Sequence, residues 1–187
     1  MRIISGQFKG RKLSKINQSI SMKSLRPTLD RVRESCFNSI VHNNFCNLKG
    51  IKTLDLFAGT GSNGLEALSR GSSFVTFVDR SSESLQIIKK NIHILGINNG
   101  TQILKMDATN LGNNYFDFSF GLVFMDPPYD FDNYNEVFSS LAKNNLIAHD
   151  ALAVIELSKK KSFKINNYSL IKKKIISNSC FLFLEKT

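Results

Sequence analysis

Residues 53–64 have the sequence Thr-Leu-Asp-Leu-Phe-Ala-Gly-Thr-Gly-Ser-Asn-Gly, and this stretch decides the fold. Its first half is short and apolar, which is typical of a buried strand. The glycines come next, and residues 65–68 then predict a helix that ends near Arg70-Gly71, where a basic residue precedes a glycine. Strand, glycine turn and helix in this order let a nucleotide-like ligand approach the backbone closely. A second apolar strand, residues 74–78, ends in Asp79, an acid placed to hold two ribose hydroxyls.

Two kinds of ligand suit this loop. Gly59, Gly61 and Gly64 match the dinucleotide fingerprint, and Asp79 follows Gly59 by 20 residues, which favours an NAD-dependent oxidoreductase. Asp55 argues against a dinucleotide, because a carboxylate in the strand that feeds the loop would repel a pyrophosphate in a poorly solvated crevice. It suits a ligand with a positive amino-acid head and no phosphate, so we expect S-adenosylmethionine. A loop-stabilising role for Asp55 is compatible with such binding.

The second motif is Asp126-Pro127-Pro128-Tyr129, which directly follows the apolar run of residues 122–125. The Asp126 carboxylate and the Pro127 carbonyl can accept hydrogen bonds from an amino group. Proline fixes φ and has no N–H, so this corner presents acceptors in a set direction. Tyr129 can stack on the face of a base. We therefore expect Asp126, Pro127 and Tyr129 to be the catalytic residues for an amino group on a planar ring. The alternative is a strand that ends in a structural proline turn.

From residue 51 onward strands and helices alternate, which predicts an α/β fold with a parallel sheet and helices on both faces. The expected helices cover residues 62–70, 81–95 and 133–144, and the expected strands cover 52–57, 74–79, 101–106, 121–126 and 151–157. Residues 168–176 and 180–185 predict a closing hairpin that makes one strand antiparallel. Such sheets bind ligands at the carboxyl ends of their strands, where Asp55, Asp79, Asp107 and Asp126 would all lie.

The two ends of the chain are basic and the middle is acidic. Residues 1–33 carry nine Lys or Arg and one acid, residues 159–174 carry seven Lys and no acid, and residues 34–158 carry 8 basic and 13 acidic residues. This distribution favours a nucleic-acid partner, and lysine drift in a Lys-rich proteome is the alternative. The expected phosphate contacts are Arg2, Lys9, Arg11, Lys12, Arg26, Arg31 and Arg33.

We divide the chain into a basic N-terminal β extension, residues 1–24, and a single catalytic domain, residues 25–187. The extension has the pattern of a hairpin that is too polar to join the core. Thr28 can cap the helix that follows. Its core-facing residues are expected to be Leu29, Val32, Cys36, Phe37 and Ile40, which leaves Arg31 and Arg33 off the apolar stripe.

Composition limits the remaining function classes. The 187 residues lack a run of 18 apolar residues and a signal-peptide pattern, so we expect a cytoplasmic protein with no membrane partner. The cysteines and histidines are scattered without metal-ligand spacing, which predicts a reducing compartment and no metal. These residues are Cys36, Cys46, Cys180, His42, His93 and His149.

Asp-x-Phe-x-Gly-x-Gly from Asp55, together with Asp126-Pro-Pro-Tyr, resembles the class I methyltransferases that act on amino groups. Three longer stretches resemble the RsmD family of bacterial 16S rRNA guanine-N2 methyltransferases. These are residues 1–13, the Leu-Arg-Pro-Thr-x-Asp-Arg-Val-Arg-Glu sequence from Leu25, and residues 54–71. The likeness runs from residue 1 to the final hairpin and is weakest in the lysine-rich tail.

The resemblance implies a Rossmann-like fold with a seven-stranded, mostly parallel sheet, and methyl transfer from S-adenosylmethionine to N2 of one guanine. It implies 16S rRNA as substrate, within the 30S subunit or a late assembly intermediate, and we expect a monomer. It assigns the adenine edge of the cofactor to Asp107 and Ala108, although a simple turn role for Asp107 has equal weight. The cofactor-binding residues are then Asp55, Phe57, Gly59, Gly61, Asp79, Asp107 and Ala108. Two residues depart from the family pattern: Phe8, where tryptophan is frequent, and Asn63, where a small apolar residue is usual.

Other functions stay open. A DNA adenine or cytosine amino-methyltransferase uses the same tetrapeptide, but this short chain has no obvious target-recognition domain. A protein-glutamine methyltransferase resembles Asn-Pro-Pro-Tyr, whereas this chain has Asp126. A ribosome-assembly binder whose methylation is incidental is the alternative from a different class.

Overall fold

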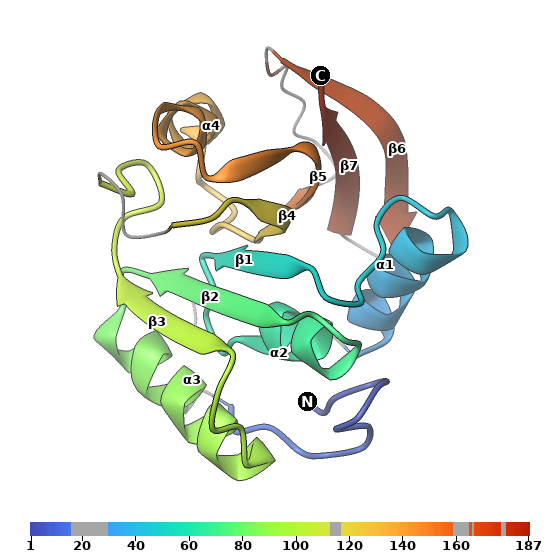
Figure 1. Ribbon diagram of the computed structural model, residues 1–187, viewed down its shortest axis with the longest axis vertical. Coiled ribbons are helices and arrows are strands. Elements are labelled where there is room, and N and C mark those ends of the chain that lie inside the picture. The colour runs from blue at the N-terminus through green and yellow to red at the C-terminus, as the bar shows by residue number, and fades with distance from the viewer. Residues whose placement is uncertain (16–29, 113–116, 159–164, 166, 177–178) are drawn as a thin grey trace.

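The computed structural model describes residues 1–15, 30–112, 117–158, 165, 167–176 and 179–187. Its centre is a seven-stranded sheet in the order β3-β2-β1-β4-β5-β7-β6 (Figure 1). The strands are β1 (Lys52–Leu56), β2 (Phe74–Asp79), β3 (Thr101–Lys105), β4 (Phe120–Met125), β5 (Ile147–Ser158), β6 (Tyr168–Ile176) and β7 (Ser179–Lys186). The first five pair in parallel, whereas β7 runs antiparallel to both β5 and β6. The expected sheet and its antiparallel closing hairpin are therefore confirmed.

Four helices flank the sheet within the described residues: α1 (Asp30–His42), α2 (Ser62–Ser69), α3 (Ser82–Leu95) and α4 (Tyr134–Lys143). In Figure 1, α4 lies on one side of the sheet, and α1, α2 and α3 lie on the other. The buried clusters agree with this division. Side chains of α4 pack with Met125 and Ile155, whereas those of α1 pack with Phe124 and Val154. Neighbouring residues of β4 and β5 thus point to opposite faces, as strand geometry requires.

The N-terminal segment forms a turn whose ends meet in an antiparallel bridge between Arg2 and Lys12. Its polar appearance in the sequence was misleading, because Ile3 and Leu13 are buried in the cluster that covers β2 beneath α2 and α3. Met1 and Phe8 also pack against this cluster, whereas the cations of the segment are exposed. The expectation that this segment lies outside the core is therefore wrong. The proposed boundary between residues 24 and 25 falls outside the described residues.

The elements match their expected positions closely except at β5, which begins at Ile147 rather than at residue 151. Its first residues pair with the start of β4 across an irregularity between Phe120 and Leu122. His149 and Asp150 are exposed there, which hides the strand from a hydrophobic pattern. Thr28 and Leu29, the expected cap and first core residue of α1, lie outside the described part. None of the described helices has the length and apolar character needed to cross a bilayer.

Candidate active site

The glycine loop between β1 and α2 is the most constrained part of the carboxyl edge of the sheet. Gly59 and Gly61 have φ values of 55° and 75°, in the left-handed region that side chains disfavour. Gly64 is required for a different reason, because a Cβ there would lie 2.4 Å from Cε1 of Phe77 and 2.7 Å from Cγ1 of Val75. The first turn of α2 therefore lies directly against β2. A residue larger than glycine at position 64 would push α2 away from β2.

Two carboxylates hold this loop. Asp55 Oδ2 accepts a hydrogen bond from Gly64 N at 2.8 Å, and Asp79 Oδ2 accepts one from Gly59 N at 2.8 Å. Asp79 Oδ1 also accepts from Ser81 N at 2.8 Å, at the start of α3. Asp55 is 1% exposed, so it acts in this structure as the loop-stabilising acceptor. Its direct contact with a cofactor stays a prediction.

The environment of Asp55 disfavours its charged form. Burial raises its pKa from 3.8 to about 8; the hydrogen bond from Gly64 opposes the rise and the Asp79 carboxylate adds to it. A positive charge that approaches Asp55 would stabilise its ionised form. A positively charged ligand would supply that charge, and a pyrophosphate would not. The electrostatics of the loop therefore agree with the ligand preference that the sequence indicates.

Phe57 links the glycine loop to the second motif. It has a φ of 56°, a conformation that costs energy for a residue with a side chain and that occurs preferentially at functional sites. Its ring packs edge-on against Phe131 with centroids 4.9 Å apart, and Phe131 packs against Tyr134 at 5.2 Å. These rings connect the end of β1 to the segment after β4.

Asp126-Pro127-Pro128-Tyr129 leaves β4 next to the glycine loop. Leu56 of β1 pairs with Met125 of β4, so Phe57 and Asp126 both come one residue after paired positions of adjacent strands. Asp126 is half-buried, Pro127 is buried and Tyr129 is 48% exposed. The turn is closed by a hydrogen bond from Phe131 N to the Pro128 carbonyl at 3.0 Å. The motif therefore combines a fixed backbone with an accessible aromatic face.

Asp107 lies at the same edge, after β3. Its carboxylate accepts from Thr109 N at 2.9 Å and from Thr109 Oγ1 at 2.7 Å, and these bonds hold the Asp107 pKa below its usual value. Asp107 thus has the turn role that the sequence allowed. The neighbouring Ala108 is buried against the core. Contact of either residue with an adenine ring stays a prediction.

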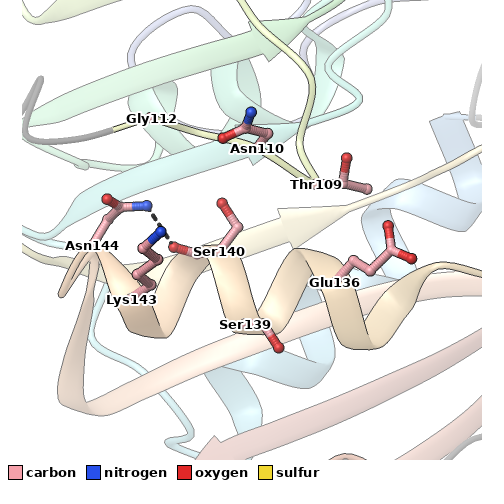
Figure 2. Close-up of a pocket in the computed structure, with 8 residues that line it drawn as sticks. All are labelled: Thr109, Asn110, Gly112, Glu136, Ser139, Ser140, Lys143 and Asn144. Atoms are coloured by element: carbon pink, nitrogen blue, oxygen red, sulfur yellow. Dashed lines mark hydrogen bonds between the residues drawn. The ribbon is translucent and has the colours of Figure 1, made fainter.

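A polar pocket of about 270 Å³ lies beyond this turn, between the segment after β3 and one face of α4 (Figure 2). The segment is held to the helix by a hydrogen bond from Leu111 N to Ser140 Oγ at 2.9 Å. The lining contains none of the expected site residues: it consists of Thr109, Asn110, Gly112, Glu136, Ser139, Ser140, Lys143 and Asn144. This pocket is therefore distinct from the edge formed by the two motifs.

Five of the expected phosphate-binding cations are exposed in the structure: Arg2, Lys9, Arg11, Lys12 and Arg31. Arg26 lies outside the described residues. The Arg11 guanidinium also donates to the Ile94 carbonyl at 2.6 Å, which fixes the N-terminal turn against the end of α3. The exposed cations are compatible with a phosphate-binding surface.

The prediction that Arg33 contacts an RNA phosphate is not supported by its position. Its side chain is fully buried, lying 3.7 Å from Glu66 and 3.1 Å from Asp30 and donating to the Arg2 carbonyl, so it cannot meet an external phosphate in this conformation. Glu66 is also buried and accepts from Ile4 N at 2.8 Å and Ser5 N at 3.1 Å. A long side chain reaches an interior partner from the flank of a helix, and a stripe analysis of apolar residues does not detect this.

Two acids that motif analysis missed have clear structural positions. Glu66 joins α1, α2 and the N-terminal segment, and nothing in its sequence surroundings marks it as buried. Glu156 lies near the carboxyl end of β5, and its Oε1 accepts from Ser179 Oγ at 2.5 Å. An acid at the end of a long apolar run was the available signal, as it was for Asp126. Over the parts of the chain that the structure covers, no group of His, Cys, Asp and Glu side chains has the arrangement of a metal site.

The chain resembles known proteins over nearly its full length. The family model described as "Conserved hypothetical protein 95" matches residues 1–185. The chain is 32% identical to the ribosomal RNA small subunit methyltransferase D of Buchnera aphidicola, with 99% of this chain and 93% of that protein covered. It is 34% identical to the protein of the same name from Haemophilus influenzae, with 93% and 88% covered. A solved Escherichia coli structure, provisionally described as a methyltransferase, has a TM-score of 0.81 and 29% identity, with 100% of this chain and 97% of that chain covered.

Proposed function

Since the chain belongs to the RsmD family, described as Conserved hypothetical protein 95, we propose that it transfers a methyl group from S-adenosylmethionine to the exocyclic N2 of a guanine in 16S rRNA. The observation that carries this proposal is the adjacency of two motifs. The glycine loop after β1 and Asp126-Pro127-Pro128-Tyr129 after β4 leave neighbouring, paired strands at one edge of the sheet. A cofactor site and an amino-group site would thus lie side by side.

The loop fits the proposed cofactor. Gly59 and Gly61 give the loop left-handed backbone conformations that other residues disfavour, and the buried Asp55 carboxyl group, bonded to Gly64, would ionise more readily beside a positive ligand. Asp79 uses one lone pair of each oxygen for a backbone N–H, and each oxygen has further capacity to accept from a ribose hydroxyl. The residues that would hold the cofactor are Asp55, Phe57, Gly59, Gly61, Asp79, Asp107 and Ala108. When bound, S-adenosylmethionine supplies a methyl group on a positively charged sulfur.

The chain's own residues would orient the nucleophile. A guanine amino nitrogen is a weak nucleophile because its lone pair is conjugated into the ring. Asp126 and the Pro127 carbonyl would accept its two N–H groups and direct the lone pair toward the cofactor. The Asp126 carboxylate would also stabilise the positive charge that develops on the nitrogen. Tyr129, with its exposed ring, would stack on a base turned out of its RNA context.

The exposed cations of the N-terminal segment and of α1 would hold the RNA backbone. Arg2, Lys9, Arg11, Lys12 and Arg31 would neutralise phosphates, and the positive net charge of +10 would speed association. The names of the relatives support small-subunit rRNA as the substrate. A cytoplasmic monomer that acts on the 30S subunit or a late assembly intermediate belongs to the same proposal, with Arg26 as a further phosphate contact.

The test is methyl transfer from labelled S-adenosylmethionine to 30S particles, naked 16S rRNA and DNA, followed by nucleoside analysis. The proposal expects N2-methylguanosine in 30S particles and no label in DNA. Methylated adenine or cytosine in DNA would overturn the substrate and keep the chemistry. An absence of label with retained cofactor binding would favour the assembly-binder function.

A further inference from the structure

Glu156 lies one strand away from the proposed catalytic acid. β4 and β5 are parallel and pair Met125 with Ile155, so Asp126 and Glu156 both follow a paired position by one residue. Neighbouring strands are about 4.8 Å apart in the sheet. The two acids therefore stand close together at the carboxyl edge, and neither the glycine loop nor the tetrapeptide motif includes Glu156.

The face on which Glu156 lies follows from the packing of its strand. Ile155 and Leu157 belong to the cluster covered by α4, whereas Val154 belongs to the cluster covered by α1. Because side chains alternate along a strand, Glu156 is on the α1 side. The surroundings of the Cys36 thiol, on α1, agree with this side. Burial raises the pKa of Cys36, and the Glu156 and Asp126 carboxylates raise it further.

The Glu156 carboxylate is held in position and stays in reach of solvent. Ser179 Oγ donates to its Oε1 at 2.5 Å, and the side chain is half-buried. An ionised carboxylate has about four lone-pair sites, so it can accept from several donors at once. A fixed, half-buried acid beside Asp126 has the properties of a group that recognises a ligand.

The Watson–Crick edge of guanine offers donors to two acceptors, because N1–H and the N2 amino group are adjacent. Adenine has an unprotonated N1 at the same place, and its lone pair would face the carboxylate. We propose that Glu156 is a specificity-determining residue, which accepts the N1–H of guanine while Asp126 engages the N2 amino group. This inference rests on the proposed function, and it adds the means by which guanine is selected.

The experiment compares guanine with 2-aminopurine at the methylated position of 16S rRNA, introduced by ligation and assembled into 30S particles. 2-Aminopurine keeps the amino group but has an unprotonated N1. The kcat/KM for methyl transfer to each substrate is measured for the wild type, Glu156→Gln and Glu185→Gln. Glutamine keeps an oxygen that accepts from Ser179, and its amide can donate to an unprotonated N1. Glu185 is the matched control, since it is an exposed glutamate of β7 paired with Leu152 of β5, away from the carboxyl edge.

The wild type is expected to prefer guanine about tenfold to a hundredfold, as expected for one hydrogen bond to a charged group. Glu156→Gln is expected to lose that preference, while Glu185→Gln keeps it. Ser179→Ala, which leaves the carboxylate in place but removes its orienting bond, is expected to weaken the preference severalfold. It serves as the second variant if Glu156→Gln does not fold.

Two results would overturn the inference. One is a variant that lowers kcat/KM equally for both substrates, which is the behaviour of a residue that only anchors β7. The other is an unchanged preference for guanine over 2-aminopurine in Glu156→Gln, or in Ser179→Ala if Glu156→Gln does not fold. Failure of the proposed function can be distinguished from both results, because the wild type would then transfer no methyl group to 30S particles that carry guanine at this position.

Discussion

Asp55 of β1 and Asp79 of β2 hold opposite ends of the same glycine loop, through Gly64 N and Gly59 N respectively, each at 2.8 Å. The two acids therefore have a structural task that precedes any contact with a ligand. A loop fixed by two carboxylates presents its backbone in one conformation, so less ordering is needed when the cofactor binds. It also places two acidic side chains close to the proposed position of a positive ligand.

The ionisation of Asp55 should make stability depend on pH. Its folded pKa of about 8 lies above the value of 3.8 for a free carboxyl, so the folded protein retains a proton that the unfolded chain loses. The free energy of unfolding should fall as pH rises from 4 to 8, by up to about 1.4 kcal/mol per pH unit. Asp55→Asn removes this dependence. Urea unfolding at several pH values measures it, with exposed Asp150→Asn as the control; parallel curves for wild type and Asp55→Asn would contradict the assignment.

Gly64→Ala should destabilise the protein by about 1–3 kcal/mol, because the new methyl group overlaps Phe77 and Val75 and must displace α2. Gly96→Ala is the control. Gly96 has a φ of 70° with no atom near its added Cβ, so that variant carries only the backbone cost of about 1 kcal/mol. Thermal unfolding of both variants measures the difference. Equal losses would mean that α2 does not depend on its close contact with β2.

Arg33→Ala should cost about 3–5 kcal/mol in unfolding free energy, because it leaves Glu66 buried with less compensation. Arg2→Ala removes an exposed partner of Asp30 and should cost less than about 1 kcal/mol. Chemical denaturation distinguishes the two. A small effect at Arg33 would show that the buried pair contributes nothing beyond the bond between Arg70 and Glu66.

The RNA surface predicts a salt effect. Each phosphate contact should contribute about −0.7 to the slope of log affinity against log salt on single-stranded RNA. Lys9→Gln and Lys12→Gln should each make the slope shallower by about that amount, whereas Lys143→Gln on α4, across the sheet from α1, should not. Filter binding of 16S rRNA over a range of salt concentrations provides the measurement. Identical slopes in all variants would remove the N-terminal cations from the interface.

Much of the fold was predictable because the strands are apolar runs that end at glycines or acids. The start of β5 was not, because its polar residues at 149 and 150 interrupt the pattern. The role of Ile3 and Leu13 was missed for the opposite reason: two apolar residues among many cations are too few to mark a buried segment.

The sequence predicted that the candidate site lies at the carboxyl edge of the sheet. The sequence indicated that Asp55, Asp79, Asp107 and Asp126 gather there, and the strand order agrees. It could not indicate which backbone N–H each acid meets, because that depends on the path of the loop. Glu156 carries a local signal, an acid at the end of an apolar run, whereas Arg33 was misassigned and Glu66 was missed because their partners are distant in the sequence. Such pairings follow from tertiary packing and leave no local motif.

The role of Asp126 in methylation is tested most directly by a single-turnover assay of N2-methylguanosine formation in 30S particles by the wild type and by Asp126→Ala, with cofactor affinity measured on the same samples. We expect methylation at one guanine by the wild type. We expect a loss of about 100- to 1,000-fold in Asp126→Ala, by analogy with the removal of other charge-stabilising groups, with cofactor binding retained. Undiminished methylation by Asp126→Ala, or label at any other atom of the RNA, would contradict the proposed function of this site.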